Sequence, residues 1–157
     1  MERLRPALFV TLSMIALCAR ADSTTCDAAC KEARINAYFD RLSGVYRQGS
    51  ASADVDRLFD LLAPNVRYVH IEYDASFERA EWKEAFIGNL ERGAYKKDKN
   101  ELIEVTQIIH GRSHSAVEYR YVRRRKDGEL ELADDQGGLL ALFGFEGEQI
   151  VLIEEYW

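Results

Sequence analysis

The last third of the sequence, residues 102–157, constrains the fold most, because it predicts a meander of long β-strands that must bury one face. The segments with strand composition are Leu102–His110, Ser115–Arg124, Leu130–Phe145 and Gln149–Trp157. In the second segment Val117, Tyr119 and Tyr121 alternate with charged residues, which is the two-residue period of a half-buried strand. The Asp-Gly pair at 127–128 supplies the positive-φ positions of a hairpin turn. We expect this sheet to curve around helices from the first half of the chain and to form a cup.

Two features of the meander predict its local shape. The run Ile150–Ile153 is apolar on both faces, so we expect the last strand to lie inside the sheet and to be covered on both sides. Gly137 and Gly138 interrupt the third segment, and paired glycines within a long strand predict a bulge or a sharp bend.

The first 21 residues have the pattern of a signal peptide. Two arginines near the start precede an apolar run at 7–17, which is too short to span a bilayer, and Ala19-Arg20-Ala21 matches a small-x-small cleavage site. A retained membrane anchor is the alternative, and lipidation at Cys18 is disfavoured by the bulky residue before it. We expect an exported protein, periplasmic or secreted, whose mature chain begins at Asp22 and forms one domain over 22–157.

The charge of the mature chain excludes some classes of partner. Its 18 basic and 26 acidic residues give a net charge of −8. An acidic exported domain is a poor candidate for binding nucleic acid or an anionic membrane. The basic run Arg123–Lys126 falls at a predicted hairpin tip, where a solvated charge cluster is the ordinary explanation.

Cys26 and Cys30 are the two cysteines of the mature chain, and they lie four residues apart at the start of a predicted helix. On a helix this spacing places the Cα atoms about 6 Å apart, within the range that a disulfide accepts. Export favours pairing. A redox-active pair would have C-x-x-C spacing, and a metal site would need further ligands nearby, so we expect a structural disulfide and no metal.

The first half of the chain predicts helices around one short strand. The expected elements are helices at 28–47, 55–62 and 79–91 and a strand at 66–73. We expect Asp54 to cap the second helix and Pro64 to end it, and Gly93 to stop the third.

This order of elements resembles a known superfamily at two motifs. Residues Leu58–Tyr68 (LFDLLAPNVRY) look like the helix-to-strand passage of the nuclear transport factor 2-like (NTF2-like) superfamily, with its SnoaL-like and ketosteroid-isomerase-like branches. The ending, Phe145–Ile150 followed by Glu155–Trp157, resembles that superfamily's last turn and strand. The resemblance covers 33–157. It implies an α+β cone, or roll, in which three N-terminal helices pack in a strongly curved antiparallel sheet. This fold hosts isomerases, dehydratases, cyclases, hydrolases and binding modules, so it does not imply an activity.

Steroid isomerisation is disfavoured by the residues at matching positions. The resemblance places His70 where ketosteroid isomerases have their general-base aspartate. It places Ala141 where they have a second, protonated aspartate, and the family's helix-one tyrosine has no clean match.

The strand register that this resemblance implies assigns a set of side chains to the inside of the cup. The candidate ligand-binding residues are Tyr68, Tyr119, Tyr121, Phe143, Ile153 and Trp157. The candidate catalytic residues are His70, Glu155 and Asp135. A histidine oriented by a carboxylate can act as a general base near neutral pH.

Each of these candidates also has a structural explanation. His70 is equally well explained as a hydrogen-bonded core histidine, Glu155 as the partner of an arginine such as Arg120, and Trp157 as core or as part of a dimer interface. His110 and His114 flank a turn and are expected on the surface.

Two functions remain open. In the first, the domain binds a small hydrophobic molecule or a partner in its cone-shaped pocket, without assured catalysis. In the second, it is a cofactor-independent SnoaL-like enzyme that uses His70 as general base. The resemblance also implies a homodimer through the outer sheet face, where we expect Ile103, Val105 and Ile109 or their alternates together with Leu140 and Leu142.

Overall fold

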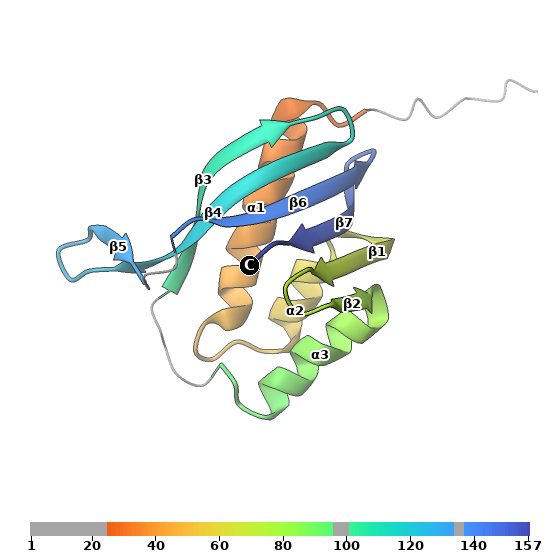
Figure 1. Ribbon diagram of the computed structural model, residues 1–157. Helices are drawn as coiled ribbons and strands as arrows, with labels where there is room; N and C mark the ends of the chain where they lie inside the picture. The colour runs from red at the N-terminus through yellow and green to blue at the C-terminus, as the bar shows by residue number, and fades with distance from the viewer. Residues whose placement is uncertain (1–24, 96–100, 134–136) are drawn as a thin grey trace, which may run out of the picture.

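The computed structural model describes residues 25–95, 101–133 and 137–157, so the predicted signal peptide and Asp135 lie outside the described residues. Three helices pack against one curved sheet of seven strands (Figure 1). The helices are α1 Ala28–Tyr46, α2 Ser52–Phe59 and α3 Arg79–Glu91. The strands are β1 Leu62–His70, β2 Ala75–Glu78, β3 Glu101–His110, β4 His114–Arg124, β5 Leu130–Leu132, β6 Leu139–Glu146 and β7 Gln149–Glu155. None of the described helices is long and apolar enough to cross a membrane. The three helices packed against one curved sheet confirm the predicted α+β cone.

The sheet has the order β2-β1-β7-β6-β4-β3, with β5 paired to β4. The meander strands pair antiparallel as predicted, whereas β1 and β7 run parallel, so the sheet is mixed. The last strand lies inside the sheet, as expected, between β1 and β6. It is not covered on both faces, because Ile150 and Ile153 are buried while Val151 and Leu152 are only half-buried.

Helix α1 covers the inner face of the sheet and supplies much of the core (Figure 1). Its Tyr38 and Phe39 contact Phe143 of β6 edge-to-face, with ring centroids 5.3 and 5.6 Å apart. Phe39 also lies 4.7 Å from the ring of Tyr119 on β4. Aromatic pairs with this geometry stabilise a core beyond their buried area. The helix therefore fills the part of the cup above β4 and β6 with its own side chains.

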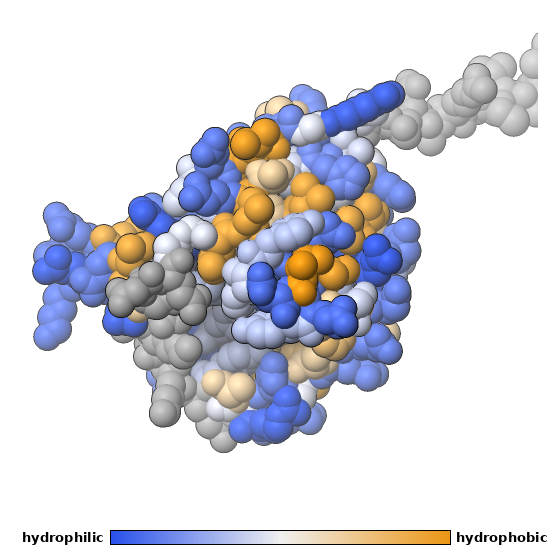
Figure 2. All heavy atoms as spheres, viewed as in Figure 1, coloured by the Kyte–Doolittle hydropathy of each residue, from blue (hydrophilic) through white to orange (hydrophobic). Residues whose placement is uncertain are grey.

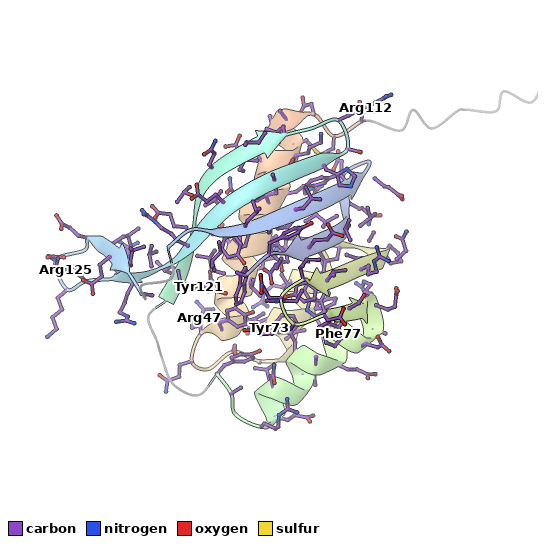
Figure 3. All side chains as sticks on the ribbon, in the orientation of Figure 1. Arg47, Tyr73, Phe77, Arg112, Tyr121 and Arg125 are labelled. Carbon is purple, nitrogen blue, oxygen red and sulfur yellow. A yellow bond between two sulfur atoms is a disulfide. The ribbon has the colours of Figure 1, made fainter. Side chains whose placement is uncertain are left out.

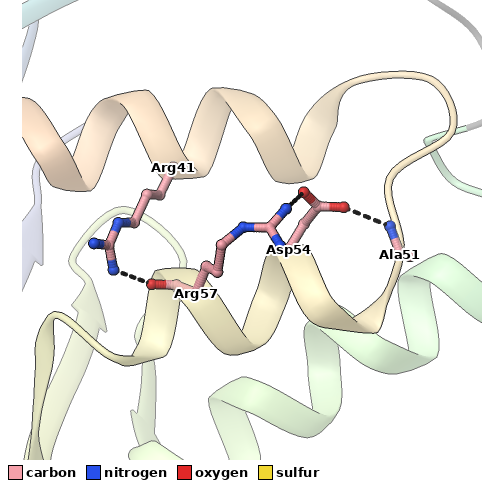
Figure 4. A network of polar contacts seen from close by, with 4 residues as sticks. All are labelled: Arg41, Ala51, Asp54 and Arg57. Atoms are coloured by element: carbon pink, nitrogen blue, oxygen red, sulfur yellow. Dashed lines mark hydrogen bonds and ion pairs between the residues drawn. The ribbon is translucent and has the colours of Figure 1, made fainter.

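Helix α2 begins and ends earlier than predicted. Asp54 is not the N-cap but lies three residues inside it, where its carboxylate accepts a 2.8 Å hydrogen bond from the backbone N–H of Ala51. Arg57 pairs with the same carboxylate, and Arg41 of α1 donates to the Arg57 carbonyl, which ties the two helices together (Figure 4). Pro64 lies in β1, in the register shift between Leu62 and Arg67, where no ladder hydrogen bond is required of it.

Strand β1 ends at His70 rather than at residue 73, and the chain turns back into β2, which the sequence did not predict. Asp74 closes this turn at φ 48°, a left-handed conformation that aspartate tolerates better than most residues. The hairpin leads directly into α3, whose bounds match the prediction.

A bulge at Thr106 changes the face of the sheet on which the apolar residues of β3 lie. The pairing moves from Val105–Tyr119 to Gln107–Glu118, leaving Thr106 as the extra residue. Ile103 and Val105 therefore pack against the core, as Ile108 does beyond the bulge, whereas Ile109 is 63% exposed. The expectation that Ile103 and Val105 face outward with Ile109 is wrong for this reason.

The long third strand of the predicted meander is two strands, β5 and β6. The interruption ends at the paired glycines, where Gly137 has φ 76°. A Cβ at Gly138 would lie 2.3 Å from Oε1 of Glu118, so this position requires glycine unless that side chain moves.

The N-terminal end of α1 carries a local disulfide and one lysine that binds a distant turn. A disulfide joins Cys26 to Cys30, whose Cα atoms are 5.2 Å apart. Lys31, only 3% exposed, donates from Nζ to the carbonyls of Gly111 (2.7 Å) and Arg112 (2.8 Å) in the β3–β4 turn. The sequence did not suggest Lys31, because a lone lysine near a helix start is usually solvated.

Candidate functional site

A buried carboxylate held by two tyrosines lies at the end of the central strand β7. Glu155 is 6% exposed, and the hydroxyl of Tyr68 on β1 donates to its Oε2. The hydroxyl of Tyr119 on β4 donates to Oε1 at 2.9 Å, and Nε1 of Trp157 donates to the Tyr119 oxygen at 2.6 Å. We call these four residues the Glu155 cluster. It joins strands that are distant in sequence, because β7 lies between β1 and the rest of the meander.

The electrostatics of the cluster are those of an acid in an apolar site. Burial raises the pKa of Glu155, and the hydrogen bonds from Tyr68 and Tyr119 and the nearby charge of His70 offset part of that rise. Burial, together with the carboxylate itself, also raises the pKa of Tyr68 and of Tyr119, so both hydroxyls remain protonated donors.

Glu155 has no basic partner among the described residues, none of which brings a lysine, arginine or histidine nitrogen within 4.0 Å of its carboxylate. Arg120, the partner considered from the sequence, pairs instead with Glu104 at 2.7 Å. Arg120 alternates with the inward-facing Tyr119 and therefore projects from the opposite face of the sheet.

His70 lies beside the cluster without joining it. It is 5% exposed, and its Cα pairs with that of Glu155 across the β1–β7 ladder. Within the described part of the chain neither ring nitrogen has a hydrogen-bond partner. The ring instead contacts two aromatic rings, Tyr73 at 4.3 Å and Trp157 at 4.7 Å between centroids. His70 is therefore inside the fold, as predicted, but the described residues do not form the expected hydrogen bond between its ring and a carboxylate.

The predicted ligand-binding residues differ in burial and fall into three groups. Phe143 and Ile153 are fully buried beneath α1, and they act as core rather than as walls of an open pocket. Tyr68 and Trp157 are half-buried members of the Glu155 cluster, and Tyr121 is half-buried and packs against the core. Tyr119 is fully buried but contributes its hydroxyl to the cluster.

Two aromatic residues near the cluster were missed as site residues. Trp82 of α3 stacks on Tyr68, with ring centroids 4.5 Å apart and an interplanar angle of 15°. Tyr73, in the turn after β1, is 71% exposed and covers one side of His70 (Figure 3). The helical spacing of Trp82 predicted its burial but not its contact with Tyr68, which depends on how α3 packs against β1.

Within the described ranges, the other histidines and the acidic residues do not gather into a group with metal-binding geometry. Nδ1 of the half-buried His110 lies 3.0 Å from Oγ of Ser115, and His114 is exposed. Among the described residues no group of three histidine, cysteine, aspartate or glutamate side chains could hold a metal ion. A separate depression of about 540 Å³ runs along α3, lined by Arg79, Lys83 and Ile87 among others, and none of the predicted site residues borders it.

Comparison with known proteins identifies the fold through structure alone. No protein-family model and no curated protein sequence matches the chain. An NTF2-like protein of unknown function from Burkholderia pseudomallei matches with a TM-score of 0.54 at 13% identity, covering 82% of this chain and 90% of that one. The fold is NTF2-like.

Further solved structures with the NTF2-like fold agree. A candidate ketosteroid isomerase from Kribbella flavida matches with a TM-score of 0.53 at 17% identity over 82% of this chain and 78% of its own. A SnoaL-like protein of unknown function from Burkholderia thailandensis matches with a TM-score of 0.53 at 12% identity over 83% and 96%. At such low identity the likeness establishes the NTF2-like fold and leaves the activity to the site residues.

Proposed function

We propose that this NTF2-like domain is an exported module that binds a small, mainly apolar molecule between the sheet and the helices, with Glu155 as the polar contact. The observation that carries the proposal is the Glu155 cluster: a buried carboxylate whose hydrogen-bond donors are neutral hydroxyls. Ligand sites in proteins are typically apolar and aromatic, with a few polar groups that fix orientation.

The energetics of Glu155 favour a functional role over a structural one. A buried carboxylate without a basic partner reduces the stability of the fold, because its charged form loses hydration. Leucine or glutamine at this position would avoid that loss. Acids whose pKa is shifted by burial are concentrated at functional sites, where interactions with a ligand or substrate offset the cost of burying them.

A second candidate function rests on His70. Its ring nitrogens are free of hydrogen bonds to the described residues, and Glu155 lies across the ladder from it. If the domain is an enzyme, His70 removes a proton from a bound substrate and Glu155 stabilises the imidazolium that results. Replacement of His70 by Gln should then abolish turnover of any molecule that native mass spectrometry recovers with the protein, while leaving that molecule bound.

Tryptophan fluorescence offers a direct test of binding. The chain has two tryptophans: Trp82 contacts the cluster by stacking on Tyr68, and Trp157 belongs to the cluster through its bond to Tyr119. We expect the neutral probe N-phenyl-1-naphthylamine to bind saturably near one-to-one and to quench them by energy transfer.

The matched variants locate the probe. Tyr68→Ala should weaken its binding by about 10-fold, within the 1–3 kcal/mol range for removing a buried contact. Leu132→Ala on the distant strand β5 should bind as the wild type does. Folded wild-type protein that takes up no probe, or a Tyr68→Ala variant that binds normally, would rule out this location.

A further inference from the structure

We infer that, if the domain binds its ligand at Glu155 as proposed, the ligand carries an alkylated ammonium group that lies against this carboxylate. Three properties of the Glu155 cluster support this chemical class: its missing counter-charge, its aromatic surroundings and its occupied acceptor sites.

The missing counter-charge favours a cation. None of the ion pairs of the described residues includes Glu155; Arg120, for example, pairs with Glu104, and Lys83 pairs with Asp56. A charge buried in a medium of low dielectric interacts strongly with an opposite charge brought next to it. A neutral ligand would leave the charge of Glu155 offset by the tyrosine hydroxyls and the nearby His70 alone among the described residues, whereas a cationic ligand completes an ion pair.

The aromatic surroundings favour a cation with a large, weakly hydrated surface. Tyr68 and Tyr119 are hydrogen-bonded to the two carboxylate oxygens, and Trp157 is bonded to Tyr119. A group that reaches the carboxylate therefore comes close to these aromatic side chains. Aromatic faces attract cations, and cages of aromatic rings are a recurrent way to bind quaternary ammonium.

The acceptor sites distinguish alkylated from primary amines. Each oxygen of Glu155 already accepts a hydrogen bond from a tyrosine, which occupies two of its roughly four lone-pair sites. A primary ammonium brings three N–H donors that need acceptors, and aromatic walls supply few. A dimethylated ammonium has one such donor and a trimethylated ammonium has none, so these groups lose less when they leave water.

Choline and its uncharged isostere 3,3-dimethyl-1-butanol differ in charge and hardly in shape, which makes them the probes for this inference. We expect the wild-type protein, titrated by tryptophan fluorescence at constant ionic strength, to bind choline at least ~10-fold more tightly, corresponding to about 1.4 kcal/mol. Glu155→Gln should remove that preference.

Glu154→Gln is the matched control, because it changes the net charge by the same amount. Glu154 is the preceding residue, and its carboxylate accepts from Tyr156 instead of from the cluster. This variant should keep the full preference for choline. If Glu155→Gln does not fold, Trp157→Leu serves in its place, and it should reduce choline binding more than binding of the alcohol.

The outcomes separate the inference from the proposed function. Equal binding of choline and the alcohol by the wild type, or an undiminished preference in Glu155→Gln, overturns the ammonium inference and leaves ligand binding at the cluster standing. Failure of choline, the alcohol and N-phenyl-1-naphthylamine alike to bind would overturn both.

Discussion

Tyr119 of β4 reaches Glu155 of β7 across an intervening strand, and the hydroxyl-to-carboxylate distance is 2.9 Å. The intervening residue is Ala141 of β6, which pairs directly with Glu155 and is fully buried. A methyl group at this position leaves room for the two longer side chains to meet above it. The small side chain of Ala141 is thus part of what assembles the Glu155 cluster.

We therefore predict that Ala141→Leu breaks the contact between Tyr119 and Glu155. Extra methylene groups in a close-packed core lower the free energy of unfolding by about 1–3 kcal/mol. Urea unfolding measures this loss, and Leu132→Ala on the exposed strand β5 should change stability by less than about 0.5 kcal/mol. A variant as stable as the wild type, with unchanged tyrosine and tryptophan spectra, would contradict the role of Ala141.

The pH dependence of folding should report the buried acid. Because the pKa of Glu155 is raised in the fold, its protonated form contributes stability that is fully present below the unfolded-state pKa of about 4.5 and is lost as the pH rises through the folded-state pKa. Glu155→Gln should therefore lose less stability than the wild type between pH 4 and pH 8. Parallel curves for the two proteins would count against a raised pKa, and Glu154→Gln controls for net charge.

The disulfide at the start of α1 should stabilise the fold modestly. It closes a loop of only a few residues, for which the chain-entropy model gives about 2 kcal/mol. The double variant Cys26→Ser, Cys30→Ser should unfold at a correspondingly lower urea concentration. The wild type treated with reductant should behave in the same way, and no change in either protein would show that the bridge does not contribute.

Lys31 should matter as much as the disulfide. Its ammonium group donates to two carbonyls of the β3–β4 turn from a buried position. Hydrogen bonds from a charged donor contribute about 1.5–3 kcal/mol, so Lys31→Met should lower the free energy of unfolding by that amount. Glu32→Gln, at the exposed neighbouring position, is the control for the same helix turn. Faster amide exchange confined to the β3–β4 turn would locate the effect.

We expect a homodimer formed through the outer sheet face, where apolar side chains gather (Figure 2). Ile109, Leu140 and Tyr156 are exposed there, and Leu142 is half-buried between them. Apolar patches on a sheet face are commonly covered by a partner. Sedimentation should show a dimer at micromolar concentration that Leu140→Lys dissociates, whereas Leu130→Lys on β5 should not. A wild-type monomer at that concentration would end the expectation.

Much of the fold follows from local sequence patterns. The bounds of α3, most of β3 and β4 and the spacing of Cys26 and Cys30 were predictable, because helical periodicity, strand alternation and turn residues act within a few neighbours. The burial of Glu155 and His70 was also predicted, since alternation within each of their strands assigns the side chain to the inner face.

Tertiary structure decided what those inner residues contact. The parallel pairing of β1 with β7 sets His70 opposite Glu155. The bulge at Thr106 places Ile108 on the inner face of the sheet and Ile109 on the outer face. The packing of α3 against β1 stacks Trp82 on Tyr68. These arrangements depend on register and packing between segments far apart in the chain, where a shift of one residue reverses the face that a side chain presents. The sequence by itself determined the elements and the polarity of the interior, and only the assembled sheet turned Tyr68, Tyr119 and Glu155 into a cluster.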